Sequence, residues 1–158
     1  KMLNEYLQFA SSTFSEKGET FNLTKLTDEI VDKYENSNIT KKLDNEIYVN
    51  GRKNLIRRCF NNLIDNSIKY GNNISVQLIK RNNSIQINID DDGPGIEEKE
   101  YDNVFKPFYK IDKSRGNPKS SVGLGLSIAS DIIRSHGGNI ILDKSPIGGL
   151  RVKISLPL

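Results

Sequence analysis

The sequence lacks the residues and runs that mark several classes of protein. A single cysteine, Cys59, stands among 158 residues, which excludes an internal disulfide. Its apolar neighbours predict a buried thiol. The longest largely apolar stretch free of charge covers only residues 120–130, whereas a membrane-spanning helix needs roughly 20 apolar residues. The sequence therefore predicts one compact domain that does not itself span a membrane.

A strong charge of one sign is also absent. The 23 basic and 20 acidic residues give a net charge of +3, and the basic residues are scattered along the chain. Nucleic-acid binding domains gather such residues into patches, often with interleaved aromatic side chains. The charge pattern therefore argues against a nucleic-acid partner.

Hydrophobic periodicity divides most of the chain into alternating helices and strands. Helical spacing predicts helices at about 23–34, 54–70 and 123–135, with a short one near 97–104. Alternation predicts a hairpin of strands 74–80 and 84–91, and further strands at about 39–43, 47–49, 139–144 and 150–156. Gly71 is expected to end the long helix in the left-handed conformation. The order predicts an α+β fold: a two-layer α/β sandwich, with a mixed, mostly antiparallel sheet packed against helices.

The beginning of the chain differs in character. Residues 2–10 have apolar side chains at helical spacing, and the polar stretch 11–20 separates them from the rest. The chain starts at Lys1 and shows no secretory leader. We expect a fragment of a longer protein, with residues 1–15 as the end of a preceding unit and its linker, and residues 16–158 as the main domain.

Two asparagines and a lysine share one line of the long helix. At 100° per residue, Asn62, Asn66 and Lys69 fall within a sector of about 60°. Asparagine is a poor helix former, so two of them at this spacing favour a binding site over a merely solvated face. Amide oxygens suit a Mg²⁺ ion that stays partly hydrated and is shared with phosphates.

An aspartate follows the apolar side of a predicted strand. Strand alternation places Asp91 on the face of Ile85, Ile87 and Ile89. An unpaired buried acid is costly, so Asp91 needs a donor from the protein or from a ligand, such as the amino group of adenine. The following glycines would let backbone approach a flat ring. The alternative for this Asp-Gly-Pro-Gly segment is a plain turn.

Two further features suit a phosphate chain. Glycines 123 and 125 begin an apolar-faced helix, whose first N–H groups can receive an anion. Before them, residues 106–121 form a long stretch with five basic side chains, which favours a lid or a disordered segment. Taken singly, the glycines are a weak signal, because glycine pairs before helices are common in loops, and any one lysine is better explained as solvated surface.

Together these segments resemble the ATP-binding catalytic domain of bacterial sensor histidine kinases, in the superfamily shared with gyrase, HSP90 and MutL. Residues 62–70 resemble the asparagine box of that family, and residues 91–96 its first glycine box. Residues 105–108 resemble the phenylalanine box, and residues 123–126 the second glycine box. The resemblance begins near Phe21, is most similar to the osmosensor type, and makes residues 2–10 similar to the close of the dimerisation hairpin.

The resemblance implies a Bergerat-type fold with a flexible ATP lid and assigns roles to the matching residues. Asn66 and Asn62 would hold Mg²⁺ on the nucleotide and, with Lys69, serve catalysis. Ser121 departs from the pattern, because the second glycine box usually begins with another glycine. The implied ATP-binding residues are Tyr70, Asp91, Gly93, Gly95, Ile96, Phe105, Phe108, Lys110, Arg115, Gly123, Leu124, Gly125 and Leu126.

The implied activity is transfer of the γ-phosphoryl group of ATP to a histidine, for relay to an aspartate of a response regulator. The one histidine, His136, precedes a glycine pair at a helix end, where a capping role is expected. The acceptor therefore belongs to the missing dimerisation domain, and this chain should bind ATP without labelling itself on histidine. The resemblance further implies a monomeric cytoplasmic fragment of a homodimeric parent anchored in the bacterial inner membrane.

Three alternatives stay open from the sequence. The chain could be a non-kinase ATPase or an anti-sigma-type serine kinase of the same superfamily. It could also be a nucleotide-binding regulatory module without catalysis. Finally, the parent could also dephosphorylate its response regulator.

Overall fold

A five-stranded sheet forms one layer of the molecule. The computed structural model describes residues 16–107, 109 and 124–158, with the backbone alone described at Leu124. The strand order is β2-β4-β5-β7-β6, in which β2 pairs with β4 in parallel and the other neighbours are antiparallel. The bounds are β2 Asn38–Leu43, β4 Asn73–Lys80, β5 Ser84–Asp91, β6 Asn139–Lys144 and β7 Leu150–Pro157.

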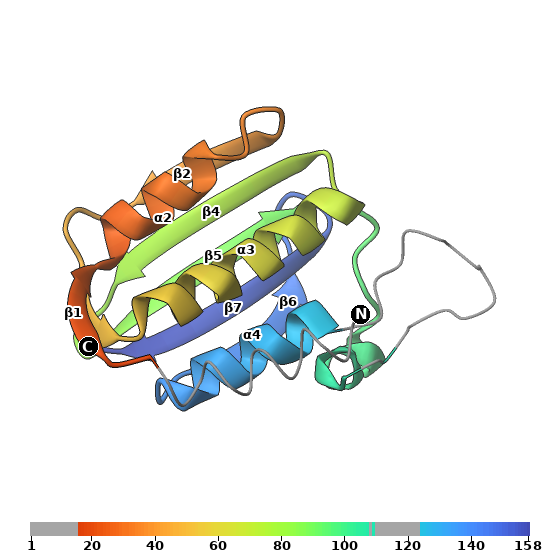
Figure 1. The fold of residues 1–158 in the computed structure, drawn as a ribbon. Helices are drawn as coiled ribbons and strands as arrows, with labels where there is room; N and C mark the ends of the chain where they lie inside the picture. Colours follow the sequence, from red (N-terminus) through yellow and green to blue (C-terminus); the bar gives the residue numbers. More distant parts are fainter. Residues whose placement is uncertain (1–15, 108, 110–123) are drawn as a thin grey trace.

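Helices form the second layer and cover one face of this sheet (Figure 1). They are α2 (Leu23–Asp32), α3 (Lys53–Tyr70) and α4 (Leu124–Ser135). The long helix α3 lies across the middle strands, and α4 runs antiparallel to it (Figure 1). The end of α3 and the start of α4 therefore point to the same side of the molecule, where the 3₁₀ helices η1 (Glu98–Glu100) and η2 (Asn103–Phe105) also lie.

The core lies between the two layers. Alternate residues of the central strands, such as Ile85, Ile87 and Ile89, are almost fully buried under the helices. The buried side of α3 includes Cys59, whose thiol donates to the carbonyl of Ala129 in α4 at 3.7 Å. Burial raises the pKa of this thiol, so Cys59 is an inert part of the core, as the sequence predicted.

A small second sheet was not predicted from the sequence. β1 (Glu19–Asn22) pairs antiparallel with β3 (Tyr48–Gly51), and α2 follows directly, with the Asn22 side chain accepting from the Lys25 amide at 3.0 Å. The prediction placed the first two residues of β1 in a linker and gave the other two no strand. Three of its four residues are polar or charged, so it lacks the apolar alternation that marks a strand.

Two local predictions were wrong. Gly71 follows α3 with φ −120° and ψ 162°, which is extended rather than left-handed. In place of one short helix at 97–104, the structure has the two 3₁₀ turns η1 and η2. The other helices and strands are confirmed within a few residues. The helix predicted at residues 2–10 lies outside the described residues. Among the described helices, none combines the length and apolar character needed to cross a membrane.

Candidate nucleotide-binding site

The second half of α3 carries the predicted line of amides. Asn62, Asn66 and Lys69 are all half-buried, beside the fully buried face that includes Leu63. The ammonium group of Lys69 lies 5.7 Å from the ring centroid of Tyr70, within the range of a cation–π contact. The structure therefore confirms that the three polar side chains share one side of the helix.

A neighbouring polar line of α3 has a structural role instead. The Tyr34 hydroxyl contacts the Asp65 carboxylate at 2.8 Å and the Asn61 side-chain oxygen at 3.1 Å. Burial, followed by the bond to Asp65, raises the pKa of Tyr34. Asn61 and Asp65 therefore fasten Tyr34, two residues past the end of α2, to α3, whereas Asn62 and Asn66 take no part in this contact.

Asp91 ends β5 with its side chain turned into the molecule. Its exposed fraction is 3%. Oδ1 accepts hydrogen bonds from the backbone N–H of Gly93 at 2.9 Å and of Leu150 at 3.2 Å. Burial raises the pKa of Asp91, and the two backbone bonds oppose this rise. Both bonds fall on Oδ1, so Oδ2 has accepting capacity that they do not use.

Three glycines allow backbone to close around Asp91. A Cβ at Gly149 would lie 2.2 Å from the Asp91 Oδ1, and one at Gly93 would lie 2.4 Å from the carbonyl oxygen of Tyr70. A Cβ at Gly71 would lie 2.9 Å from the Cβ of Asp91. Gly71 is thus required for close approach rather than for a left-handed turn. Gly95, at φ +72°, is in the conformation that favours glycine.

Asp92 joins the end of β5 to the segment that follows α3, a role that the sequence did not predict. Its Oδ1 accepts from the backbone N–H groups of Asn72 at 2.7 Å and Asn73 at 3.0 Å, and its Oδ2 accepts from the Asn73 side chain at 2.7 Å. These bonds lower the pKa of Asp92, the Asn73 backbone bond most. Asp92 therefore holds the segment after α3 against the residues that follow β5.

The lowered pKa of Asp92 predicts a dependence of stability on acid. A carboxyl whose pKa is lower in the folded state stabilises the fold above its unfolded pKa, and this contribution is lost as pH falls through the folded pKa. Asp92→Asn should flatten the acid side of a plot of the free energy of unfolding against pH. Urea unfolding at several pH values below 5 measures this, and an unchanged slope would contradict the role given to Asp92.

The remaining predicted residues are only partly placed. Ile96 and Phe105 are half-buried against the core. Leu124 begins α4, and Leu126 packs partly against the core. No described atom lies within 4 Å of a Cβ built on Gly125, so described neighbours do not require glycine there. Four predicted residues lie outside the described part of the chain: Phe108, Lys110, Arg115 and Gly123.

His136 stands away from this site, just past the end of α4. Its Nδ1 lies 2.7 Å from the carbonyl oxygen of Ile132, and its Nε2 accepts from the backbone N–H of Arg52 at 2.9 Å. Nδ1 therefore carries the proton. Both ring nitrogens are engaged in holding α4 to the beginning of α3, in agreement with the capping role expected from the sequence.

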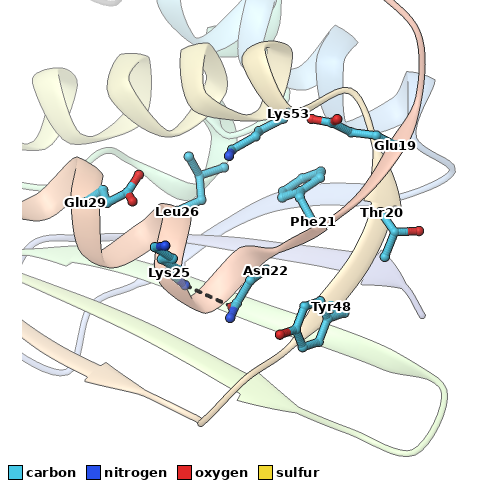
Figure 2. A pocket seen from close by; sticks show the side chains of 9 residues that line it. All are labelled: Glu19, Thr20, Phe21, Asn22, Lys25, Leu26, Glu29, Tyr48 and Lys53. Atoms are coloured by element: carbon cyan, nitrogen blue, oxygen red, sulfur yellow. Dashed lines mark hydrogen bonds between the residues drawn. The ribbon is translucent and has the colours of Figure 1, made fainter.

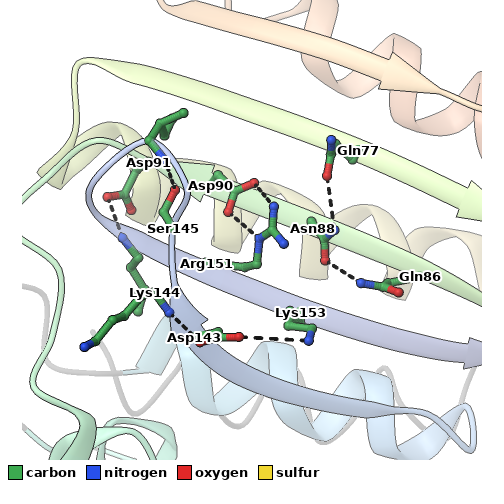
Figure 3. A network of polar contacts seen from close by, with 12 residues as sticks. Gln77, Gln86, Asn88, Asp90, Asp91, Asp143, Lys144, Ser145, Arg151 and Lys153 are labelled. Atoms are coloured by element: carbon green, nitrogen blue, oxygen red, sulfur yellow. Dashed lines mark hydrogen bonds and ion pairs between the residues drawn. The ribbon is translucent and has the colours of Figure 1, made fainter.

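The opposite face of the sheet carries a buried polar network (Figure 3). Arg151 of β7 forms a two-pronged ion pair with Asp90 of β5, at 2.8 and 3.0 Å. Beside it, the side chain of Asn88 donates to Gln77 at 3.1 Å. Asp90 is 2% exposed and fully paired. Adjacent acids of one strand thus serve two faces: Asp90 is a structural group, and Asp91 faces the candidate site.

A separate groove lies at the other end of the helical layer (Figure 2). It has a volume of about 360 Å³ and is lined by residues of β1, α2 and β3 with the first residue of α3, among them Phe21, Lys25, Tyr48 and Lys53. None of the predicted nucleotide-binding residues lines it. The chemistry predicted from the sequence therefore does not belong to this groove.

The described residues contain no cluster of three or more His, Cys, Asp or Glu side chains that could hold a metal ion. A divalent cation at the candidate site would need oxygen ligands of another kind. The amide oxygens of Asn62 and Asn66 are such ligands, and they suit a cation that brings water and phosphate oxygens with it.

Comparison with known proteins places this geometry in a family. Residues 51–158 match the family described as histidine kinase-, DNA gyrase B-, and HSP90-like ATPase. The sensor histidine kinase CpxA of Escherichia coli is 36% identical over 109 residues, 68% of this chain and 24% of CpxA. The sensor histidine kinase WalK of Bacillus subtilis is 28% identical over 171 residues, 99% of this chain and 28% of WalK.

A solved structure supports the same assignment. The catalytic domain of the histidine kinase ThkA is 26% identical and superposes with a TM-score of 0.77, covering 89% of this chain and 97% of that chain. The chain spans about a quarter of the length of the curated relatives CpxA and WalK. From the family match over residues 51–158 and the shared fold, the chain belongs to the family of histidine kinase-, gyrase B- and HSP90-like ATPases.

Proposed function

We propose that this chain is the ATP-binding catalytic domain of a two-component sensor histidine kinase. In this role it binds ATP with Mg²⁺ and donates the γ-phosphoryl group to a histidine of a preceding dimerisation domain. A response regulator then receives the group on an aspartate. The similarity to CpxA and WalK supports this proposal, because both are named as sensor histidine kinases. The chain matches about a quarter of the length of each.

The observation that carries the proposal is the placement of Asp91. A carboxylate is turned inward at the end of a buried strand, its Oδ1 is held by two backbone N–H groups, and glycines surround it. We assign Oδ2 to the exocyclic amino group of adenine. The specificity of such a site comes from a buried polar atom that another base would leave unpaired.

We assign the phosphates and the cation to the second half of α3 and the start of α4. Asn66 and Asn62 supply amide oxygens to Mg²⁺, and Lys69 supplies positive charge. The first N–H groups of α4 face an anion favourably. A Cβ at Gly125 would meet no described atom within 4 Å, which suits a phosphate chain that passes close to the backbone. Phosphoryl transfer needs mainly positioning and neutralisation of charge, which these groups supply.

Asn66→Ala is expected to remove most of the magnesium dependence of nucleotide binding. Calorimetric titration with a nonhydrolysable ATP analogue measures this, with and without Mg²⁺. We expect the affinity gained from Mg²⁺ to fall about tenfold in the variant, equivalent to about 1.4 kcal/mol.

Asn61→Ala is the matched control, because Asn61 is on the adjacent line of α3 and bonds to Tyr34. It should leave the magnesium effect unchanged. An Asn66→Ala variant that keeps the full magnesium effect would contradict the assignment of this side chain to the cation.

We further propose that residues 1–15 belong to the end of the dimerisation hairpin and its linker. The alignment with WalK supports this, since it extends over 99% of the chain. We do not assign the phosphoryl acceptor to His136, because both of its ring nitrogens are bonded within the fold. These bonds support an acceptor supplied by another domain.

A further inference from the structure

The first turn of α3 is capped by groups from outside the helix. The residue before α3, Arg52, makes no side-chain cap. The carboxylate of Glu16 accepts from the N–H groups of Asn54 at 2.8 Å and of Leu55 at 3.1 Å, one on each oxygen. In contrast, α2 is capped locally by Asn22, three residues from its donor. A charged acceptor at the positive end of a helix is a strong cap.

Glu16 is the first residue that the structure describes, three residues before β1 begins. It stands 38 residues before Asn54 in the sequence. Its bonds therefore do more than complete a helix end. They fasten residues 16–18, which lead into β1 and are called the entering segment below, to the beginning of α3.

The other end of α3 is held in a similar way. Asp92, next to Asp91, accepts from the backbone N–H groups of Asn72 and Asn73, just past the helix. The helix that carries Asn62, Asn66 and Lys69 thus lies between two carboxylates from other segments. An α-helix of 18 residues is about 27 Å long and moves largely as one body. A change at Glu16 can therefore shift the polar line relative to Asp91.

We propose that Glu16 is a positioning residue for the nucleotide site, coupling the entering segment to α3. The inference deepens the proposed function and rests on it. Displacement of the entering segment would withdraw the carboxylate, loosen the first turn of α3 and lower the affinity for nucleotide. Because coupling between two equilibria is reciprocal, bound nucleotide would in turn strengthen the cap.

Glu16→Gln tests this in the 158-residue chain, because it removes the charge while keeping one acceptor oxygen. We expect the affinity for a nonhydrolysable ATP analogue with Mg²⁺ to fall about three- to tenfold. The control is Glu19→Gln, which removes the same charge from the exposed first residue of β1 and should change affinity by less than about twofold. A purely structural cap would lower the melting temperature and leave the affinity unchanged.

Hydrogen exchange of the wild-type chain supplies the second measurement. The amides of Asn54 and Leu55 should exchange more slowly once nucleotide is bound. Any one of three results would overturn this inference while leaving the proposed function intact. The first is equal nucleotide affinity of Glu16→Gln and the wild type, and the second is an equal effect of Glu16→Gln and Glu19→Gln. The third is that nucleotide leaves the exchange rates of both amides unchanged. Absence of nucleotide binding by the folded wild-type chain would instead overturn the proposed function on which it rests.

Discussion

Asp91→Asn is expected to weaken binding of an ATP analogue roughly 10- to 150-fold, equivalent to about 1.5–3 kcal/mol for a hydrogen bond to a charged group. The amide oxygen can still accept from the N–H groups of Gly93 and Leu150, so the loop should keep its shape. The amide nitrogen would then replace Oδ2 and face the adenine amino group, donor against donor. The loss should therefore appear in affinity and not in folding.

The stability of this variant should stay the same or rise. The pKa of Asp91 is raised by burial, which means that the fold disfavours the charged form. A carboxyl whose pKa is higher in the folded state makes the fold less stable as pH rises from its unfolded pKa to its folded pKa. A neutral amide does not carry this cost. Thermal unfolding of Asp91→Asn beside the wild type measures it.

Asp90→Asn is the matched control for Asp91→Asn. It alters the adjacent acid, which pairs with Arg151 on the other face of the sheet. Breaking one side of a buried pair should lower stability and leave nucleotide affinity near that of the wild type. If Asp91→Asn bound the analogue as tightly as the wild type, the adenine assignment would be wrong.

Gly149→Ala is expected to destabilise the fold by about 3 kcal/mol or more, because the new methyl group would overlap backbone. Its Cβ would lie 2.2 Å from the Asp91 Oδ1, 2.6 Å from the Asp91 carbonyl oxygen and 2.6 Å from the Gly93 nitrogen. Neither the end of a sheet strand nor the adjoining loop can move far without breaking the bond from the Gly149 amide to the Asp91 carbonyl.

A fall in melting temperature of roughly 6–12 °C is expected for a chain of this size. Gly125→Ala is the control, since its Cβ would meet no described atom within 4 Å. In a helix this substitution should raise stability by about 0.5–1 kcal/mol. Similar melting temperatures for the two variants would contradict the close approach at Gly149.

The sequence predicted the helical and strand layers well, because their apolar residues recur at clear periods. It also placed Asp91 correctly, since strand alternation alone aims this side chain at the core. It missed β1, whose mostly polar residues show no such period. The helix ends at Gly71 as predicted, but the left-handed conformation expected there was wrong, because the need for glycine comes from Asp91, a residue 20 positions away.

The roles of Glu16 and Asp92 could not be predicted from the sequence for the same physical reason. Each side chain bonds to backbone N–H groups of a distant segment, and backbone groups leave no mark in a sequence. Isolated carboxylates at such positions look like solvated surface. Only the folded arrangement distinguishes them from the other acids of the chain.

The pairing of β5 with β7 bears on how the chain folds and how its length can vary. Ser84 is opposite Pro157, so this ladder joins residues far apart in the sequence, whereas β4 and β5 form a local hairpin. Local pairs can form early, and distant pairs slow the search for the native state. The entropy of closing a loop grows only with the logarithm of its length, by about 0.6 kcal/mol for each doubling. A longer connection between β5 and β7 should therefore cost little thermodynamically, which lets the length of the chain between these strands vary while the two layers stay constant.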